Sequence, residues 1–441
     1  MPIHTAVAAA TETTDPYVAR RYRYYVLGLM TIAYTFNFVD RQILTILQEP
    51  IKRELQLSDA QLGLLTGFSF ACFYIVLGLP IARWADRSVR RDIMALALGV
   101  WSLMTALSGL AGNYLQLLSA RIGVGIGEAG GSPPAYSMLS DIFAPRERAT
   151  ALGTYGMGVN LGILVGFLMG GWVNQLFGWR IAFFVAGVPG LLLALLLRTT
   201  LAEPKRQFSS VDGARPEEAP PVCQVLRRLW GNRTFRHMAW GSSLLSFAAY
   251  GMYTWFPSFL IRIHGLNTGA VGTWLALILG IGGAAATLGG GYLSDRLGRR
   301  DARWYCWVTV FAAAIAVPLM TLAFLIRDSR LALLCFVIPG SVAAICVPPL
   351  MAVTHALVDN RMRALSSAIV LFILNLLGLG LGPLAVGLLS DHLARAAGAN
   401  GLRYSMLLLL PAVTLLGMTH FLLATRHIGT EMVRGWESSS A

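Results

Sequence analysis

Long apolar segments recur along the whole chain, and they constrain its fold more than any other feature. A helix crosses the hydrocarbon core of a bilayer with about 20 mostly apolar residues. We expect such membrane spans at residues 24–47, 61–82, 93–111, 115–139, 150–175, 181–199, 234–261, 269–292, 304–326, 331–352, 364–390 and 403–425. The chain is 56% hydrophobic and only 13% charged, whereas soluble domains carry about 25% charged residues. The sequence therefore predicts an all-α polytopic membrane protein with twelve transmembrane helices.

The placement of basic residues predicts the orientation of these spans. If both termini face the cytoplasm, 25 of the 35 Lys and Arg residues fall in cytoplasmic segments and 8 on the opposite side. Cytoplasmic loops carry an excess of Lys and Arg, so we expect both termini inside. The net charge of +13 then lies mostly against the membrane surface and does not indicate nucleic-acid binding. The N-terminal sequence lacks the pattern of a signal peptide, and we expect none to be removed.

A polar segment divides the chain into two halves. We expect a cytoplasmic tail at 1–22, a six-helix bundle at 23–199, a linker at 200–233 with a short helix at 222–230, a second six-helix bundle at 234–426 and a C-terminal tail at 427–441. The halves also repeat, since ARWADRSVRR at 82–91 matches GYLSDRLGRR at 291–300. Two related halves are a known transporter architecture, with the binding site between them near the midplane.

The repeated loop has the composition of a conformational latch. Its aspartate can interact with a helix N-terminus, and its arginines can bridge to carbonyls or carboxylates of a neighbouring helix. We expect the second-copy glycine at 298 to supply a positive φ in the turn. The alternative is that the arginines only fix topology, but their repetition in both halves favours a latch. Its candidate residues are Asp86, Arg87, Arg90, Arg91, Gly291, Asp295, Arg296, Gly298, Arg299 and Arg300.

These features resemble a known family. The pattern G-x-x-x-D-R-x-G-R-R resembles the signature loop of the major facilitator superfamily, and GYLSDRLGRR fits it at every position. The first copy departs from it, with Ala82 and Val89 in place of both glycines. Three further segments, at 37–67, 121–141 and 177–190, resemble spinster-type lipid transporters. The resemblance implies alternating access, a loop that stabilises one face of the cycle, and an amphiphilic lipid substrate.

The segment RIGVGIGEAGGSPPAY at 121–136 contains GxGxxG, a pattern that in soluble proteins cradles a pyrophosphate. Here no strand precedes the glycines, and two prolines that should interrupt a helix follow at once. Gly123, Gly127 and Gly131 recur every four residues, which lets membrane helices pack closely. We therefore expect a helix-packing face and no bound dinucleotide or other cofactor.

Four charged residues fall well inside predicted spans: Asp40, Arg41, Arg121 and Glu128. A charge at the bilayer centre costs about 2.5–3.5 kcal/mol on insertion scales, so such residues are paired or face a wet cavity. Because Asp40 and Arg41 are adjacent, their side chains point about 100° apart on a helix. We therefore expect them to have different partners.

These four charges have two interpretations. Two ion pairs could simply join the first span to the fourth. However, the second half has no charges at corresponding positions, and a purely structural device needs no such asymmetry. We therefore favour Asp40 and Glu128 as proton-coupling residues, with Arg41 and Arg121 modulating them or holding an anionic head group. A carboxylate whose surroundings alternate during a conformational cycle would bind and release a proton.

Further candidates for the cavity come from both halves. Tyr34 and Asn37 share one face of the first span with Arg41, at i, i+3 and i+7. In the second half, one helix carries Tyr250, Tyr253 and Trp255, a nearly uncharged aromatic surface suited to the tail of an amphiphile. The alternative is that these aromatic residues belong to an interfacial belt.

The leading hypothesis is a proton-coupled secondary transporter for an amphiphilic lipid, such as a lysophospholipid or a sphingoid phosphate. A major facilitator exporter of drugs or small organic anions, or a facilitative uniporter, remains open. An ATP-driven pump of the P-loop class is excluded, because neither Lys52 nor Lys205 follows a glycine. We find no hydrolase triad or metal-ligand cluster, so we expect no enzyme, cofactor or metal. Arginine strongly outnumbers lysine, which indicates a GC-rich bacterial genome, so we expect the protein in a bacterial inner membrane. We expect it to be a monomer, in contact with protons and membrane lipids.

Overall fold

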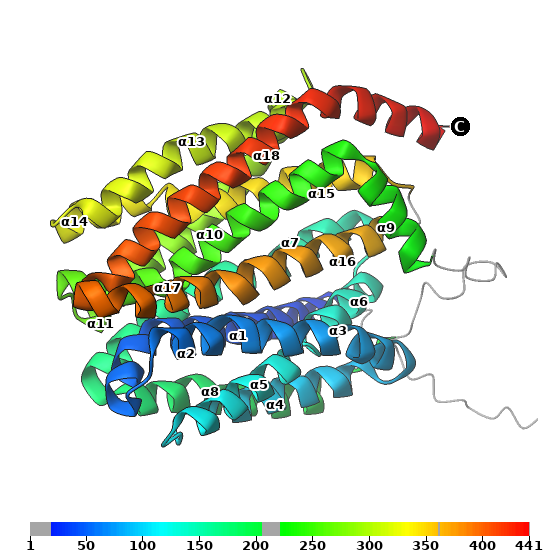
Figure 1. Cartoon of the computed structure of the whole chain (residues 1–441). Helices are drawn as coiled ribbons and strands as arrows, with labels where there is room; N and C mark the ends of the chain where they lie inside the picture. Colours follow the sequence, from blue (N-terminus) through cyan, green and yellow to red (C-terminus); the bar gives the residue numbers. More distant parts are fainter. Residues whose placement is uncertain (1–18, 205–220, 360–361, 441) are drawn as a thin grey trace, which may run out of the picture.

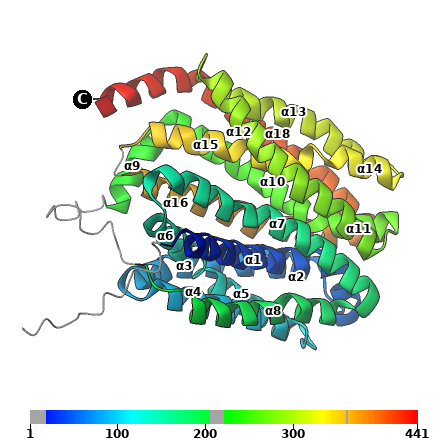
Figure 2. The same cartoon turned by 180° about the vertical axis from the view of Figure 1, so that it is seen from behind.

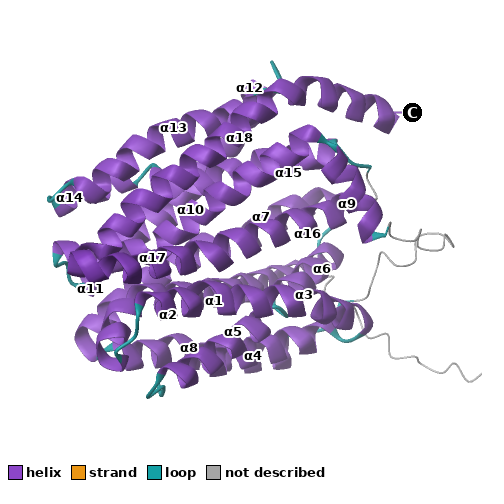
Figure 3. Cartoon of the chain, in the orientation of Figure 1, coloured by secondary structure: helices purple, strands orange, loops and turns teal. Residues whose placement is uncertain are grey.

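The computed structural model describes residues 19–204, 221–359 and 362–440, and in these ranges it contains only helices and loops (Figure 3). Most of the predicted N-terminal tail and part of the predicted linker lie outside the described residues. The helices are α1 (Arg20–Leu55), α2 (Asp59–Gly63), α3 (Ser69–Arg87), α4 (Arg90–Ser108), α5 (Tyr114–Glu128), α6 (Ser132–Ile142), α7 (Pro145–Phe177), α8 (Trp179–Thr200), α9 (Val222–Gly231), α10 (Arg233–His264), α11 (Thr268–Leu275), α12 (Gly283–Gly298), α13 (Trp304–Leu325), α14 (Ser329–Phe336), α15 (Val342–Ala356), α16 (Arg363–Leu374), α17 (Gly382–Ala397) and α18 (Gly401–Ser440).

The helices form two groups that run side by side (Figure 1). One group contains α1–α8 and the other α10–α18, and the view from behind shows the same division (Figure 2). We call the end where α1 begins and α18 finishes the terminal end. The opposite end, where α1 finishes at Leu55 and α10 at His264, is the distal end. The two groups agree with a two-half architecture, although the boundaries of the predicted bundles stay a prediction.

Polar residues set where the helices begin. Asn113, Asn232 and Asn267 precede α5, α10 and α11, and each side chain accepts a hydrogen bond from the backbone N–H three residues further on. Such caps satisfy donors that a helix N-terminus leaves free. Gly265 then closes α10 with a φ of 67°, a conformation that glycine adopts without strain. The predicted short helix in the linker is confirmed as α9.

Eight stretches of the described chain are helical, long and apolar enough to cross a membrane: 59–85, 145–177, 179–200, 233–264, 268–298, 304–325, 329–356 and 365–429. The last of these runs over α16, α17 and α18, and therefore over more than one helix. Helices α1, α4 and α5 are not among them. Helix α1 carries Asp40 and Arg41, α4 opens with two arginines, and α5 is only 15 residues long. The number of twelve spans stays a prediction.

The glycine-rich segment is a packing face, as the sequence predicts. Helix α5 ends at Glu128 and α6 begins at Ser132, so the chain breaks just before the two prolines. A Cβ added at Gly127 would lie 2.7 Å from the backbone nitrogen of Trp101 in α4, and one at Gly123 would lie 2.6 Å from the Met104 side chain. These distances leave room only for hydrogen, so the glycines let α5 pack directly on α4.

The two groups meet along two tight seams near the distal end. In the α7–α11 seam, a Cβ at Gly171 would lie 2.5 Å from the Thr268 carbonyl oxygen, and a Cβ at Gly272 would collide with the Phe167 carbonyl. The Asn174 amide also donates to the Thr268 hydroxyl across this seam, at 3.0 Å. In the α2–α17 seam, a Cβ at Gly63 would lie 2.6 Å from the Pro383 carbonyl oxygen. Backbone thus packs on backbone where the groups touch.

Gly272→Ala should weaken this distal contact. The added methyl group meets backbone atoms, which cannot move as a flexible side chain does, so we expect a cost of about 1–3 kcal/mol to the closed arrangement. Spin labels at exposed Leu176 of α7 and Leu331 of α14 would report the change as a new population at longer distance. Gly289→Ala is the control, because a Cβ there meets nothing within 4 Å. An unchanged distance distribution in the Gly272 variant would show that the seam tolerates the methyl group.

Three seam-forming stretches contain π-helical turns, which are wider than α-helical ones. They are η2 (Leu64–Phe68), η3 (Ala276–Gly282) and η6 (Asn375–Leu381). Each lies between two α-helices of one continuous helical run, η2 before α3, η3 before α12 and η6 before α17. Such turns are rare and are frequently found at functional sites.

Candidate functional site

Two of the four predicted buried charges form a direct ion pair. Arg41 of α1 approaches Glu128 of α5 through Nε and Nη2, both 2.7 Å from the same carboxylate oxygen, Oε2. The Glu128 side chain is fully buried, whereas 20% of the Arg41 side chain is exposed. The second oxygen of Glu128, Oε1, is buried without a hydrogen-bond partner in the protein. The pair is therefore only half satisfied, with the arginine as its exposed partner.

Asp40 and Arg121 lie on the buried side of the same two helices. Arg121 donates from Nη1 to the backbone oxygen of Asp40, at 3.4 Å. Arg41 thus pairs with Glu128 and not with its neighbour Asp40, as expected for side chains that point about 100° apart. Within the described residues, Asp40 Oδ1, Arg121 Nε and Asn37 Oδ1 are buried and have no hydrogen-bond partner in the protein. Unsatisfied buried polar atoms are uncommon in native structures, and here they gather around the four charges.

Aromatic rings surround the exposed face of Arg41. Its guanidinium carbon lies 4.8 Å from the ring centroids of Phe38 and Phe70 and 5.2 Å from that of Tyr74. Rings at this distance attract a cation through their π faces. Tyr250, from α10 of the other group, packs against the hydrophobic cluster that contains Phe70. Arg41 therefore combines a positive charge, partial exposure and an aromatic surround at the junction of the groups.

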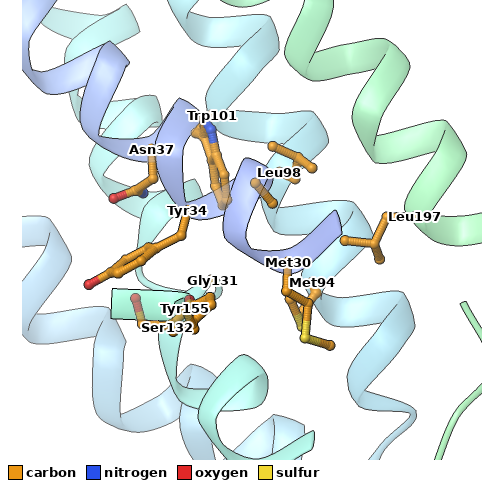
Figure 4. A pocket seen from close by; sticks show the side chains of 11 residues that line it. Met30, Tyr34, Asn37, Met94, Leu98, Trp101, Gly131, Ser132, Tyr155 and Leu197 are labelled. Atoms are coloured by element: carbon orange, nitrogen blue, oxygen red, sulfur yellow. The ribbon is translucent and has the colours of Figure 1, made fainter. Parts of the chain in front are cut away.

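Tyr34 and Asn37 line a small pocket inside the α1–α8 group (Figure 4). Met94, Leu98 and Trp101 of α4 form another wall of this pocket. The remaining lining residues are Met30, Ala33, Gly131, Ser132, Tyr155 and Leu197. Tyr34 also stacks on the Tyr155 ring, with centroids 4.4 Å apart. The structure thus brings both predicted residues together, next to the buried charges but within one group.

The three aromatic candidates of α10 have different surroundings. Tyr250 and Tyr253 are part-buried, with ring centroids 6.3 Å apart, and the Tyr253 hydroxyl donates to the Gly340 carbonyl. Trp255 is completely buried, and its Nε1 donates to the Pro383 carbonyl at 2.8 Å. In this conformation Trp255 belongs to the core between α10 and α17 and faces no open cavity.

The first copy of the repeated loop is tied to the linker. Arg90 is 3% exposed and donates to Glu203 at 2.8 Å, to Asp141 at 2.6 Å and to the Pro204 carbonyl at 3.1 Å. The backbone N–H of Arg91 donates to the same Glu203 carboxylate, at 2.9 Å. Arg87 is exposed, and the side chain of Asp86 lies outside the described part. Arg90 therefore fastens the start of the linker to the α1–α8 group.

The second copy is exposed instead. Arg296 donates to the Tyr292 hydroxyl at 3.0 Å, and no ion pair in the described ranges joins Asp295, Arg299 or Arg300 to the other group. The expected positive φ at Gly298 is wrong, because α12 continues through this residue and the positive-φ glycines lie elsewhere. A Cβ at Gly298 would lie 2.7 Å from the Tyr305 ring, so this glycine serves close packing. Gly291 has only one neighbour near a Cβ, the Pro348 side chain at 3.9 Å.

Arg90→Ala should lower stability, since it leaves two carboxylates without their partner. We expect a loss of about 2–3 kcal/mol, below the roughly 3–5 kcal/mol of a fully buried pair, because Glu203 and Asp141 are partly exposed. Thermal unfolding followed by tryptophan fluorescence in detergent would measure it. Arg87→Ala serves as control, because that arginine is exposed. Equal melting temperatures for the two variants would contradict the structural role of Arg90.

A second ion cluster, at the distal end, joins the two groups. It was not predicted from the sequence. We call it the distal cluster: Glu49, Lys52, Asp59, Arg262 and Asp391. Arg262 of α10 binds Asp59 at 2.8 and 2.9 Å and Glu49 at 2.5 and 3.1 Å. Lys52 also binds Asp59. Asp59 and Glu49 side chains are 2% and 4% exposed, so these bonds are shielded from water.

The distal cluster extends to α17 through a helix cap. The Asp391 carboxylate accepts from the backbone N–H groups of Asp59 and Ala60, at 3.0 and 2.8 Å. A carboxylate at a helix N-terminus satisfies free donors and opposes the positive end of the helix dipole. Ser390 adds a hydroxyl bond to Asp59 at 2.6 Å. Asp59 is thus held by both neighbours of the other group, α10 and α17.

Buried charges in apolar helices and helices packed through glycine seams are features of a multi-pass membrane protein. The family model of the Major Facilitator Superfamily matches residues 30–383. This chain belongs to the major facilitator superfamily. The family match and the names of the relatives make it a transporter and not an enzyme.

Within that superfamily the chain is similar to spinster proteins. A solved structure of a bacterial homologue of the human lysosomal transporter Spinster, in an inward-facing and unoccupied conformation, has a TM-score of 0.86 and 32% identity, covering 94% of this chain and 99% of that one. An MFS-type efflux pump of Mycolicibacterium smegmatis is 33% identical over 97% of this chain and 98% of the relative. The sphingosine-1-phosphate transporter SPNS2 of Danio rerio is 26% identical over 90% of this chain and 82% of its own length.

Proposed function

We propose that this protein moves an amphiphilic lipid with an anionic head group, such as a lysophospholipid or a sphingoid phosphate, by alternating access. The observation that carries the proposal is Arg41, a partly exposed cation among aromatic rings at the junction of the two groups. An arginine suits phosphate recognition, because its planar donors match phosphate geometry. Tyr250 of the other group supplies an aromatic surface for the apolar part, with Tyr253 beside it.

The proposal includes an orientation. The excess of basic residues on one side favours both termini in the cytoplasm of twelve spans, which makes the terminal end cytoplasmic and the distal end extracytoplasmic. The seams and the distal cluster then close the outer side, and the protein is inward-facing. The similarity to an inward-facing solved structure supports this assignment. The bacterial homologues favour the inner membrane, in which we propose that the protein acts as a monomer.

We also propose that transport is coupled to protons at Glu128 and Asp40. Glu128 shares one oxygen with Arg41 and keeps the other free, so substrate binding at Arg41 and protonation of Glu128 compete for one interaction. An anionic head group on Arg41 would release Glu128, which is then buried and favours the proton-bound form. Arg121 modulates Asp40 from the inner side of the cluster. The exposed second copy of the repeated loop is the part of the latch that engages when the cytoplasmic side closes.

A second candidate function is export of drugs or small organic anions. The relative from Mycolicibacterium smegmatis, an MFS-type efflux pump, covers nearly the whole chain and favours it. A cationic site with aromatic walls also suits a compact aromatic anion. The two candidates differ in whether the substrate must carry a long apolar tail.

Flux in proteoliposomes tests the proposal. Labelled lysophosphatidylglycerol should move across the membrane of reconstituted vesicles, faster with an imposed pH gradient than without one. A matched short-chain glycerophosphate ester, with the same head group and no long tail, should neither move nor compete. Transport of the short ester, or of a fluorescent drug in preference to the lysolipid, would favour the efflux alternative. Lysolipid flux that ignores the gradient would leave uniport in place of proton coupling.

A further inference from the structure

Helix α9 lies across the terminal end of the molecule instead of along the other helices (Figure 1). It covers Val222–Gly231, directly before α10, the first helix of the second group. Val225 and Leu229 are 0% and 1% exposed and belong to the hydrophobic cluster of that group. The helix is therefore fixed to the α10–α18 group by one narrow face.

A second apolar face of α9 is left partly exposed by the described residues. Val222, Leu226 and Trp230 lie four residues apart, so they form one stripe along the helix. They are 53%, 37% and 39% exposed. Because α9 lies at the end of the membrane-crossing helices, this stripe is suited to insert at the boundary between lipid head groups and acyl chains.

One arginine borders this stripe, and a second lies on the far side of the helix. At 100° per residue, Arg227 follows Trp230 around the helix, and Arg228 lies beyond the buried face of Val225. Both arginines are exposed, and neither takes part in an ion pair among the described residues. An arginine keeps its charged head at the water while its stem covers apolar surface. The stripe, with Arg227 beside it, thus matches a lipid surface with negative charge at head-group depth.

From this arrangement we infer that α9 is a docking surface for anionic phospholipid head groups of the leaflet at the terminal end. The apolar stripe enters the leaflet, and Arg227 at its edge binds the phosphates. An arginine near an anionic leaflet strengthens attachment by about fivefold. This site is separate from Arg41 and independent of which substrate the protein transports.

Helix α9 is joined directly to α10, so attachment of α9 to the leaflet also positions the α10–α18 group. Asn232 caps α10 directly after α9, and the Trp230 ring packs edge-on against Phe235, with centroids 5.9 Å apart. Glu431 of α18 accepts from the backbone N–H of Thr234 at 2.9 Å. An anchored α9 therefore holds the α10–α18 group at a fixed depth in the leaflet.

Cys223 provides the test, because it is the exposed cysteine of the described chain and adjoins the stripe, whereas Cys72 and Cys335 are half-buried and the other two are buried. A polarity-sensitive fluorophore on Cys223, in a Cys72→Ala/Cys335→Ala background, would be read in nanodiscs of phosphatidylcholine with and without phosphatidylglycerol. Emission should shift to the blue with phosphatidylglycerol, and head-group-labelled quenching lipids should quench it several-fold more.

Variants separate this docking from a general effect of charge. Arg227→Gln should abolish the phosphatidylglycerol-dependent shift and quenching. Arg330→Gln removes the same charge from an exposed position in α14, at the distal end, and should leave both signals unchanged. Emission that stays water-like in both lipid mixtures would overturn the proposal, as would an equal loss of signal in the control variant. Substrate flux plays no part in this readout, so the transport proposal can fail without affecting it.

Discussion

Glu128→Gln should abolish stimulation of flux by a pH gradient while leaving the protein folded. Glutamine keeps the size of the side chain but has no carboxylate to take up a proton, and it leaves Arg41 without its anionic partner. Without a protonatable group at this position, the part of the flux that depends on the gradient should be lost, and the gradient-independent part should remain. Flux of labelled lysolipid in proteoliposomes, with and without the gradient, measures it.

Glu54→Gln is the matched control for this experiment. Glu54 also lies on α1 and pairs with an arginine, Arg180, but the side chains are 50% and 37% exposed. Exposed pairs contribute about 0–1 kcal/mol, so this variant should keep gradient-driven flux. Gradient stimulation that survives in the Glu128 variant would remove the proton role and leave the Arg41–Glu128 pair as a structural contact. Asp40→Asn, measured beside it, separates the contribution of the second carboxylate.

Arg262→Met should open the distal end. Methionine keeps much of the apolar stem but removes every bond that Arg262 makes to Asp59 and Glu49, which leaves buried carboxylates facing each other. We expect a shift of about 3–5 kcal/mol against the closed distal end, which changes the ratio of closed to open molecules by more than about a hundredfold. Spin labels at Leu176 and Leu331 should then show a dominant population at longer distance.

Arg180→Met provides the comparison for this distal prediction. Arg180 also lies at the distal end, but its partners, Glu54 and the Ala111 carbonyl, belong to the same group of helices. The distance distribution of this variant should match that of the wild type. A closed distal end in Arg262→Met would mean that the glycine seams alone hold the groups together, and the Gly272→Ala variant would then be the stronger perturbation.

The sequence predicts local features of this molecule well. The glycine face on α5 and the pairing of Arg41 with a residue other than Asp40 follow from helix periodicity. The interruption of the helix near Pro133 and Pro134 follows from the prolines. Both kinds of prediction depend only on nearby residues. The short linker helix α9 follows from composition in the same way. The error at Gly298 arose at a helix boundary, since α12 extends through the residue expected to leave it.

The distal cluster could not be predicted in this way. Asp59 and Arg262 are 203 residues apart, and Asp59 and Asp391 are 332 apart. Asp59 and Arg262 lie at helix ends, and Asp391 lies just beyond the predicted span 364–390. Charged residues at such places are normally solvated, so no single segment signals a buried contact. Trp255 shows the same limit. The sequence suggests a cavity residue, but its ring is buried between α10 and α17, where its Nε1 donates to the Pro383 carbonyl. Contacts between the two groups depend on how the whole chain packs, whereas the sequence predicts features within single helices.

The π-helical turns in η2, η3 and η6 each contain an extra residue, which ordinary α-helices lack. A π turn holds one residue more than the α-helical hydrogen-bonding pattern requires. If such a turn tightened to an α-helical one, every side chain beyond it would rotate by about 100° around the helix axis. Beyond η6 lie Ser390 and Asp391, which grip Asp59. A shift of one residue in the hydrogen-bonding register of η6 would thus turn Ser390 and Asp391 away from Asp59 and release this contact between the groups, without a hinge at the contact itself.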